Sequence, residues 1–526
     1  MSTEPEQADQ QKTLPKPPGL LRSSGLVGMM TMLSRVLGLV RDMVIARYFG
    51  AGAGADAFFV AFKIPNFLRR LFAEGAFAQA FVPVLSSYRQ KESVTEVRRL
   101  VNAVSGVLGM VVLGVTIVAV LGSPLLTAVF APGFVGDEVK FELASEMLRI
   151  TFPYLFLISL TAFSGSILNS YDRFAVPAFT PVLLNLSMIC AAVFLSPLME
   201  TPIIALAWGV FIAGALQLFF QLPFLMQLGL MPRPRVDYRH EGVRKIMTLM
   251  LPALFGVSVS QINLLLDTVL ASFLQTGSVS WLYYSDRLSE LPLGVFGIAI
   301  GTVILPSLSR KHADASGDQF AATLDWAVRA VLLIGLPAAL ALALLAEPLI
   351  ATLFYYGEVT SRDVMMSGQA LKAYSAGLLA FMLIKVLAPG YFARQDTRTP
   401  VKIGIIAMVA NMAFNLALVF PLAHAGLALA TSLSAWLNAG LLWRGLIKEG
   451  AWSWQAGWPV FLMRIAAANA ALAGVILWFQ PPLEQWLSAD GFQRSADMAI
   501  LVAVGISAYF ATLAAVGVRV RHFRHR

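Results

Sequence analysis

Long apolar stretches recur along the whole chain, and they limit its fold more than any other feature. Fourteen of them have the length of a helix that crosses a bilayer, which needs about 20 mainly apolar residues. Charged residues make up only 13% of the 526 residues, whereas a soluble domain has about 25%. The stretches lack the ten-residue alternating pattern of outer-membrane strands. We therefore predict an all-α polytopic membrane protein with 14 transmembrane helices.

The ends of the apolar stretches give approximate helix boundaries. The expected helices span residues 22–49, 54–84, 99–127, 141–169, 176–197, 202–228, 246–274, 278–308, 321–346, 364–390, 400–420, 426–446, 460–479 and 496–518. Residues 1–20 are polar and contain proline, without the basic-then-apolar order of a cleaved signal. The first helix is therefore expected to stay in the mature protein.

Basic residues gather in alternate connections between these helices. One set of connections, together with the C-terminal end, holds 23 of the 39 Lys and Arg residues, and the other set holds only Lys140, Arg362 and Arg494. Because connections rich in Lys and Arg stay in the cytoplasm, we predict that both termini are cytoplasmic, with tails at 1–21 and 519–526. The net charge of +9 is thus a sign of topology, and no nucleic-acid partner is expected.

A weak internal repeat divides the helices into two sets. Residues 123–133 (SPLLTAVFAPG) align with residues 347–357 (EPLIATLFYYG), and Pro83 and Pro177 align with Pro306 and Pro400, all at a shift of 223 to 224 residues. The shift spans six helices, so the two copies share one orientation. We predict an N-lobe at 22–228, a C-lobe at 246–447 and two appended helices at 459–518. Two parallel lobes suit a transporter that works by alternating access.

The expected helix at 54–84 has unusually many ionisable residues for a membrane helix. Such residues are costly in lipid and are expected to face a bundle interior or a wet cavity. At 100° per residue, one face holds Asp56, Lys63, Asn66, Arg70 and Glu74, while Arg69 lies off that face. The simpler alternative is a set of ion pairs within the helix.

Two other expected helices, one from each lobe, also carry charges. The helix at 22–49 has Arg35, Arg41 and Asp42, and the helix at 278–308 has Asp286, Arg287 and Glu290. If these helices meet the one at 54–84 at the lobe interface, they form a cationic, partly neutralised cavity of the kind that binds phosphate through arginine. A pure ion-pair role in assembly is the alternative for the helix at 278–308.

A second polar group could bind a hard cation. It comprises Asp267, Asn411, Asn415 and Thr431. A carboxylate, two amide oxygens and a hydroxyl suit sodium, the only cofactor that the sequence suggests. Asparagine that simply joins membrane helices by hydrogen bonds is the alternative.

Little else in the sequence indicates chemistry. It contains no Walker loop, HExxH, CxxC or GxSxG motif, and the five histidines fall in expected loops or the C-terminal tail. An enzyme is therefore not expected, and neither is an ATP-driven pump.

Three segments resemble a known family. SRVLGLVRD, GADAFFVAFKIPNFLRRLFAEGAFAQAFVP and GSVSWLYYSDRLSELPLGVFGIAIGTVILPSLS closely resemble the MurJ/MviN lipid II flippases of bacteria, in the multidrug/oligosaccharidyl-lipid/polysaccharide exporter superfamily. The resemblance covers residues 22–520. It implies 14 helices in two lobes, a place in the cytoplasmic (inner) membrane, and movement of lipid II, the undecaprenyl-pyrophosphate-linked precursor of peptidoglycan, from the inner to the outer leaflet.

The resemblance also implies site residues and partners. The residues on which the family depends correspond here to Arg35, Arg41, Asp42, Asp56, Arg69 and Arg287, with Lys63, Asp286 and Glu290 in support. The last two helices would frame a groove for the lipid tail. Membrane lipids, and cell-wall synthesis proteins, are the other partners that the family implies. Asn415 stands where an acid would bind a cation more strongly.

Two other functions remain as alternatives. A drug or metabolite antiporter of the same superfamily would have apolar lobes with one or two acids, and the many arginines disfavour it. A membrane-embedded glycosyltransferase or ligase that acts on polyprenyl-linked sugars usually has a large outer loop with catalytic acids. The longest outer connections expected here are only about 17 residues.

Overall fold

The computed structural model describes residues 20–70, 76–313 and 317–517, and all regular secondary structure in these ranges is helical. Nine helical segments of this described part are long and apolar enough to cross a membrane. The prediction of an all-α polytopic membrane protein is confirmed, whereas the count of 14 crossings stays a prediction. Glu74, the C-terminal tail and most of the N-terminal tail lie outside the described residues.

The first half of the chain follows the expected helices with three main differences, one of which is that the helix predicted over 141–169 is divided at Phe152, just before Pro153. Its helices are α1 (Leu20–Phe49), α2 (Ala53–Leu68), α3 (Phe77–Lys91), α4 (Val94–Leu121), α5 (Ser123–Phe130), α6 (Glu138–Thr151), α7 (Pro153–Ser170), α8 (Ala175–Cys190) and α9 (Ile204–Gln227). The single helix predicted over 54–84 is instead α2 and α3, and the backbone widens at residues 69–70, one turn after Pro65, which donates no backbone hydrogen bond. The helix predicted over 99–127 ends at Leu121, because Pro124 starts the first turn of α5.

The second half contains one long helical hairpin among simpler helices. Its helices are α10 (Glu241–Ser272), α11 (Ser278–Ala313), α12 (Gly317–Leu344), α13 (Ala346–Phe354), α14 (Ser361–Phe392), α15 (Arg398–Lys448), α16 (Trp458–Phe479), α17 (Leu483–Ser488) and α18 (Gly491–Ala515). The backbone of α15 breaks at Ala423, where φ is 50°. The chain then turns back, since Arg394, just before α15, pairs with Glu449, just after it, at 2.5 Å. His424, expected in a solvated loop, is buried at this break.

The helix boundaries repeat with the shift found in the sequence. The helices α4 and α12 end at Leu121 and Leu344, which are 223 residues apart. A short helix follows each of them, α5 in the first half and α13 in the second. The lobe boundaries themselves stay a prediction.

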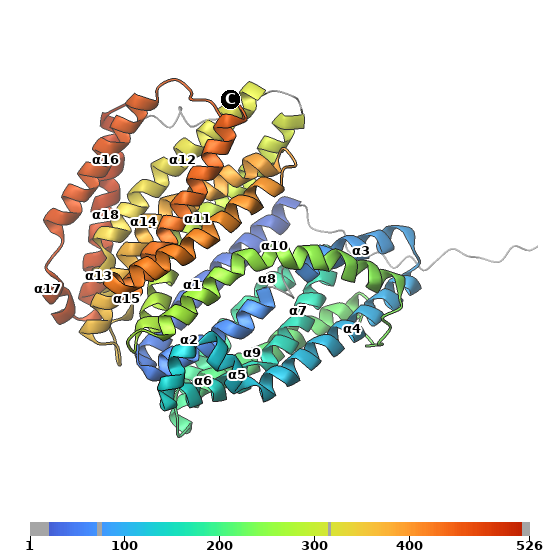
Figure 1. Ribbon diagram of the computed structural model, residues 1–526. Helices are drawn as coiled ribbons and strands as arrows, with labels where there is room; N and C mark the ends of the chain where they lie inside the picture. Colours follow the sequence, from blue (N-terminus) through green and yellow to red (C-terminus); the bar gives the residue numbers. More distant parts are fainter. Residues whose placement is uncertain (1–19, 71–75, 314–316, 518–526) are drawn as a thin grey trace, which may run out of the picture.

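The helices form two groups with α1 and α10 running between them (Figure 1). Contacts between α7 and α9 and between α2 and α6 hold the first group together, and those of α14 with α11, α12 and α15 hold the second. The helix α10 contacts both groups, because Val243 and Ile246 near its start pack in the apolar core of the first group, while its later part contacts α15.

Several polar contacts join the two groups at one end of the helices, which we call the joined end. The Gly133 N–H, in the turn Pro132–Gly136, donates to Ser272 Oγ at 3.0 Å. The Glu358 N–H donates to the carbonyl oxygen of Arg47 at 3.0 Å. A further contact is made by Asp56 and is described with the site. Away from this end the two groups of ribbons spread apart (Figure 1).

Candidate functional site

Arg41 and Asp42 form the buried centre of the candidate site. They are adjacent on α1, and only 3% and 0% of their surfaces are exposed. Arg41 donates to Asp42 Oδ1 from Nε at 2.9 Å and from Nη2 at 2.7 Å. A buried carboxylate or guanidinium needs such a partner, since an unpaired charge away from water is costly.

Arg287 brings α11 to this centre from the second group of helices. Its Nε donates to Asp42 Oδ2 at 2.8 Å, so one carboxylate accepts from two arginines. Its Nη1 donates to Glu290 Oε2 at 3.2 Å. The side chains of Arg287 and Glu290 are 33% and 50% exposed. The cluster is therefore buried at Arg41 and accessible at Arg287, where an anion can replace the Glu290 carboxylate.

Two neutral side chains complete the cluster. The Tyr283 hydroxyl donates to Asp42 Oδ1 at 3.0 Å and accepts from Arg41 Nη2 at 2.9 Å. Asn185 of α8 accepts from Arg41 Nη1 at 3.1 Å and donates to the carbonyl oxygen of Ser34 at 2.9 Å. The Tyr283 ring stacks on Phe59 of α2 with 3.9 Å between ring centroids. The orientation of both arginines is thus fixed by four helices, α1, α2, α8 and α11.

Asp56, a predicted site residue, lies at the joined end instead of in this cluster. It is 1% exposed and accepts from the Gly277 N–H at 2.7 Å, the Ser280 N–H at 2.9 Å and the Ser280 hydroxyl at 2.6 Å. Its carboxylate thereby satisfies backbone groups at the N-terminus of α11, which favours negative charge. In this conformation Asp56 joins α2 to α11, and its role as a substrate contact stays a prediction.

The other predicted site residues lie apart from one another and contact different helices. Arg35 of α1 lies against α11 at Gly294, where a Cβ atom would overlap its guanidinium. Lys63 of α2 donates to Thr268 of α10 at 3.2 Å, and the charges of Asp286 and Asp267 act on its ammonium group. The remaining two belong to the end of α2, where Arg69 donates to Asn66 at 3.2 Å and Arg70 is exposed.

The predicted cation group does come together. Asp267 of α10 accepts at Oδ1 from Asn415 Nδ2 at 2.7 Å and from Asn411 Nδ2 at 3.5 Å, and at Oδ2 from the Thr431 hydroxyl at 3.3 Å. These hydrogen bonds are the ones expected if the two asparagines simply join membrane helices. Both Asn411 Oδ1 and Asn415 Oδ1 are nevertheless buried without a hydrogen-bond partner among the described residues. Two unsatisfied amide oxygens beside a carboxylate fit a cation ligand set.

Sequence reasoning missed Tyr283, Asn185 and Ser280. Tyr283 lies four residues before Arg287, hence on the same helix face, and this spacing was a usable signal. Asn185 and Ser280 are neutral polar residues of a kind common throughout membrane helices, and nothing in the sequence distinguishes them.

Comparisons with known proteins agree with this arrangement. The family model described as lipid II flippase MurJ matches residues 45–495. A probable lipid II flippase MurJ of Vibrio cholerae is 53% identical, over 96% of this chain and 98% of that protein. A solved structure of a lipid II flippase MurJ in an inward closed conformation has a TM-score of 0.80 and 28% identity, over 93% of this chain and 97% of its own.

A more distant structure shares the fold alone. It is an inward-facing multidrug resistance transporter of the MATE family and MOP superfamily, with a TM-score of 0.65 and 17% identity over 81% of this chain and 98% of its own. The family match spans most of the chain, and the identity to the Vibrio cholerae protein extends over nearly all of it. The chain therefore belongs to the lipid II flippase MurJ family.

Proposed function

We propose that this chain moves lipid II from the inner to the outer leaflet of the bacterial cytoplasmic membrane by alternating access. The observation that carries the proposal is the meeting of Arg41 and Arg287 on one buried carboxylate, Asp42, in a chain of this family. The two arginines come from α1 and α11, which belong to the predicted N-lobe and the predicted C-lobe.

The chemistry of this cluster suits a pyrophosphate. A guanidinium can donate two parallel hydrogen bonds to phosphate oxygens, whereas an ammonium acts as a point charge. Asp42 holds both arginines in position, and Glu290 neutralises Arg287 while no anion is bound. An incoming phosphate then exchanges with Glu290 at the accessible side of the cluster, so the positive charges never lie unpaired.

The contacts between the helix groups support an alternating mechanism. Hydrogen bonds such as those from Gly277 and Ser280 to Asp56 lie at the joined end, and polar contacts of this kind can break and reform. We infer that lipid II enters from the other end and leaves when the joined end separates. The helices α16 and α18 pack on each other and on α12 and α13, where their exposed apolar side chains would guide the lipid tail.

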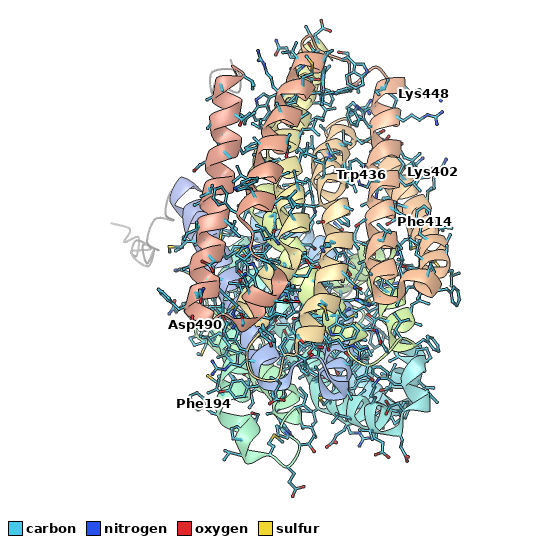
Figure 2. All side chains as sticks on the ribbon, turned by 90° about the vertical axis from the view of Figure 1, so that its left-hand side faces the viewer. Phe194, Lys402, Phe414, Trp436, Lys448 and Asp490 are labelled. Carbon is cyan, nitrogen blue, oxygen red and sulfur yellow. The ribbon has the colours of Figure 1, made fainter. Side chains whose placement is uncertain are left out.

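The orientation in the membrane is also part of the proposal. In Figure 2, Lys402 and Lys448 lie toward one end of the helices, and Phe194 and Asp490 lie toward the other. Because basic residues favour the cytoplasmic side, we infer that the lysine end and both termini face the cytoplasm. Cell-wall synthesis proteins as partners rest on family membership alone.

A sodium ion at Asp267 is a further part of the proposal. The residues fit, because the carboxylate, the Thr431 hydroxyl and the two unsatisfied amide oxygens are hard ligands. A bound sodium ion would supply charge that neutralises Asp267 and links the conformation of α10 to that of the α15 hairpin. Thr268, next to Asp267 in the sequence, accepts a hydrogen bond from Lys63 and so connects this group to α2.

The test is an assay of which leaflet holds the lipid precursor. When the protein is depleted, the precursor should stay on the cytoplasmic side, beyond the reach of an impermeant probe added outside. Expression of the parent chain should restore access, Arg287→Ala should not, and Arg149→Ala, at an exposed arginine of α6, should restore it fully. Normal outer-leaflet precursor in depleted cells would overturn the proposal.

A further inference from the structure

The α15 hairpin carries a surface groove at its basic end, separate from the arginine cluster. The groove is shallow and open to the surroundings, has a volume of about 520 Å³ and is lined by Gly440, Trp443, Arg444, Ile447, Lys448 and Trp454. The first five follow helical spacing and share one face of α15, while Trp454 comes from the loop before α16. None of them takes part in the contacts of Arg41, Asp42 or Arg287.

The groove combines an apolar floor with two cations at its rim. Arg444 and Lys448 are one turn apart and exposed, and no acid in the described part of the chain pairs with either of them. The nearby Glu449 is paired with Arg394. Two adjacent cations without a protein partner, near a membrane surface, attract anionic lipid headgroups.

The tryptophans place the groove at the surface of the bilayer. Trp443 and Trp454 have ring centroids 5.9 Å apart, and Trp454 is 61% exposed. Tryptophan prefers the boundary between hydrocarbon and headgroups. Lys448 and Lys402 both lie toward the open end of the α15 hairpin, opposite the break at Ala423 (Figure 2). A molecule in this groove would have its headgroup beside the cations and its chains along Gly440, toward the middle of the membrane.

We propose that this groove binds an anionic glycerophospholipid of the leaflet at the basic end. Its phosphate lies between Arg444 and Lys448, and its acyl chain covers Ile447 and the open surface above Gly440. A Cβ atom at Gly440 would meet no other atom within 4 Å, so the groove floor is free. The site adds a structural lipid to the transporter and does not depend on the binding of lipid II.

The experiment measures lipid binding to the purified full chain by mass spectrometry of the intact complex, with phosphatidylglycerol as the probe. We expect Arg444→Gln/Lys448→Gln to weaken phosphatidylglycerol binding about 10- to 30-fold, with no effect on zwitterionic phosphatidylcholine. The matched control, Arg244→Gln/Lys245→Gln, removes two exposed cations from α10 and should leave binding unchanged.

A second pair of variants tests the groove itself. Gly440→Leu adds a side chain at a position where a Cβ atom meets nothing within 4 Å, and it should weaken phosphatidylglycerol binding at least tenfold, while Gly114→Leu, at an equally open glycine of α4, should not. Both variants should bind lipid II as the parent does, so failure of this proposal is distinguishable from failure of the transport proposal. Parental phosphatidylglycerol binding in the two groove variants would overturn it, as would equal competition by inorganic phosphate.

Discussion

Arg287 Nε lies 2.8 Å from Asp42 Oδ2 and so connects α11 to α1 through a single ion pair. Asp42 also pairs with Arg41, which is almost fully buried. Breaking a buried ion pair on one side leaves an uncompensated charge, whereas an incoming anion can take over the freed guanidinium. The pair therefore links α11 to α1, and we expect anion binding at Arg287 to change the contact between the two helices.

We expect Arg287→Lys to reduce flipping at least about tenfold, because a lysine cannot hold Asp42 and a phosphate oxygen in the same fixed plane. Arg41→Lys should act similarly, since Arg41 donates to three different side chains. Flipping would be measured in reconstituted vesicles at equal protein amounts. Arg149→Lys is the control. Parental rates for both lysine variants would contradict a role in phosphate binding.

A glycine gives a way to move Arg35 without replacing it. A Cβ atom at Gly294 would lie within overlap distance of the Arg35 guanidinium. We expect Gly294→Ala to slow flipping as much as Arg35→Ala does, and the double variant to be no slower than either, because coupled residues are non-additive. Gly404→Ala, which meets nothing within 4 Å, is the control. Additive effects in the double variant would show that Gly294 does not act through the position of Arg35.

Asp56 should stabilise the joined end. Asp56→Ala removes the acceptor for two backbone N–H groups of α11, a loss worth about 0.5–2 kcal/mol for a helix cap. Cys190 is the only cysteine of the chain, so it is replaced first. A cysteine introduced at the buried Ser278 should then react faster with a water-soluble thiol reagent in the Asp56→Ala variant than in the parent. Asp137→Ala removes a similar cap from α6, away from α11, and should not change that rate. Equal rates in the parent and Asp56→Ala would argue against this role.

The fold class was predictable because lipid imposes one strong rule on the sequence. Only helices and closed barrels satisfy the backbone in hydrocarbon, and the apolar stretches have helix length. The break at Ala423 was located only as a gap between expected helices. The burial of His424 could not be inferred, because a short connection between membrane helices can lie inside the protein as well as in water.

The site was predictable in part for a related reason. Arginines avoid lipid, so Arg41 and Arg287 had to face the protein interior, and they meet on Asp42. Helical angles give the face of a residue but not its partner in another helix. Asp56 therefore shares a face with Lys63 in the sequence, yet it contacts the start of α11, whereas Lys63 contacts α10.

A covalent bridge at the joined end should stop transport. We expect a short thiol crosslinker between Ala53→Cys and Thr276→Cys, in a chain without Cys190, to abolish flipping, because these positions flank the Asp56–Gly277 contact between the lobes. A bridge between Gly54→Cys and Ile203→Cys lies within the first group of helices and should leave flipping intact. Undiminished flipping with the interlobe bridge complete would rule out alternating access.

The energy source of flipping can be tested by comparing one acidic position, Asp267, with one basic position, Arg287. A potential that is negative inside favours outward movement of negative charge by about 2.3 kcal/mol per charge per 100 mV, so it can drive the loaded step. A cation at Asp267 would then serve only to reset the empty carrier. We therefore expect Asp267→Ala to slow flipping less than Arg287→Ala, and collapse of the potential to slow the parent strongly. The measurement is flipping in vesicles with the sodium gradient and the potential set independently, and Asp318→Ala, at an exposed acid of α12, is the control. If sodium removal at constant potential and Asp267→Ala both abolished flipping, sodium would be the obligatory coupling ion, because the potential alone could not complete the cycle.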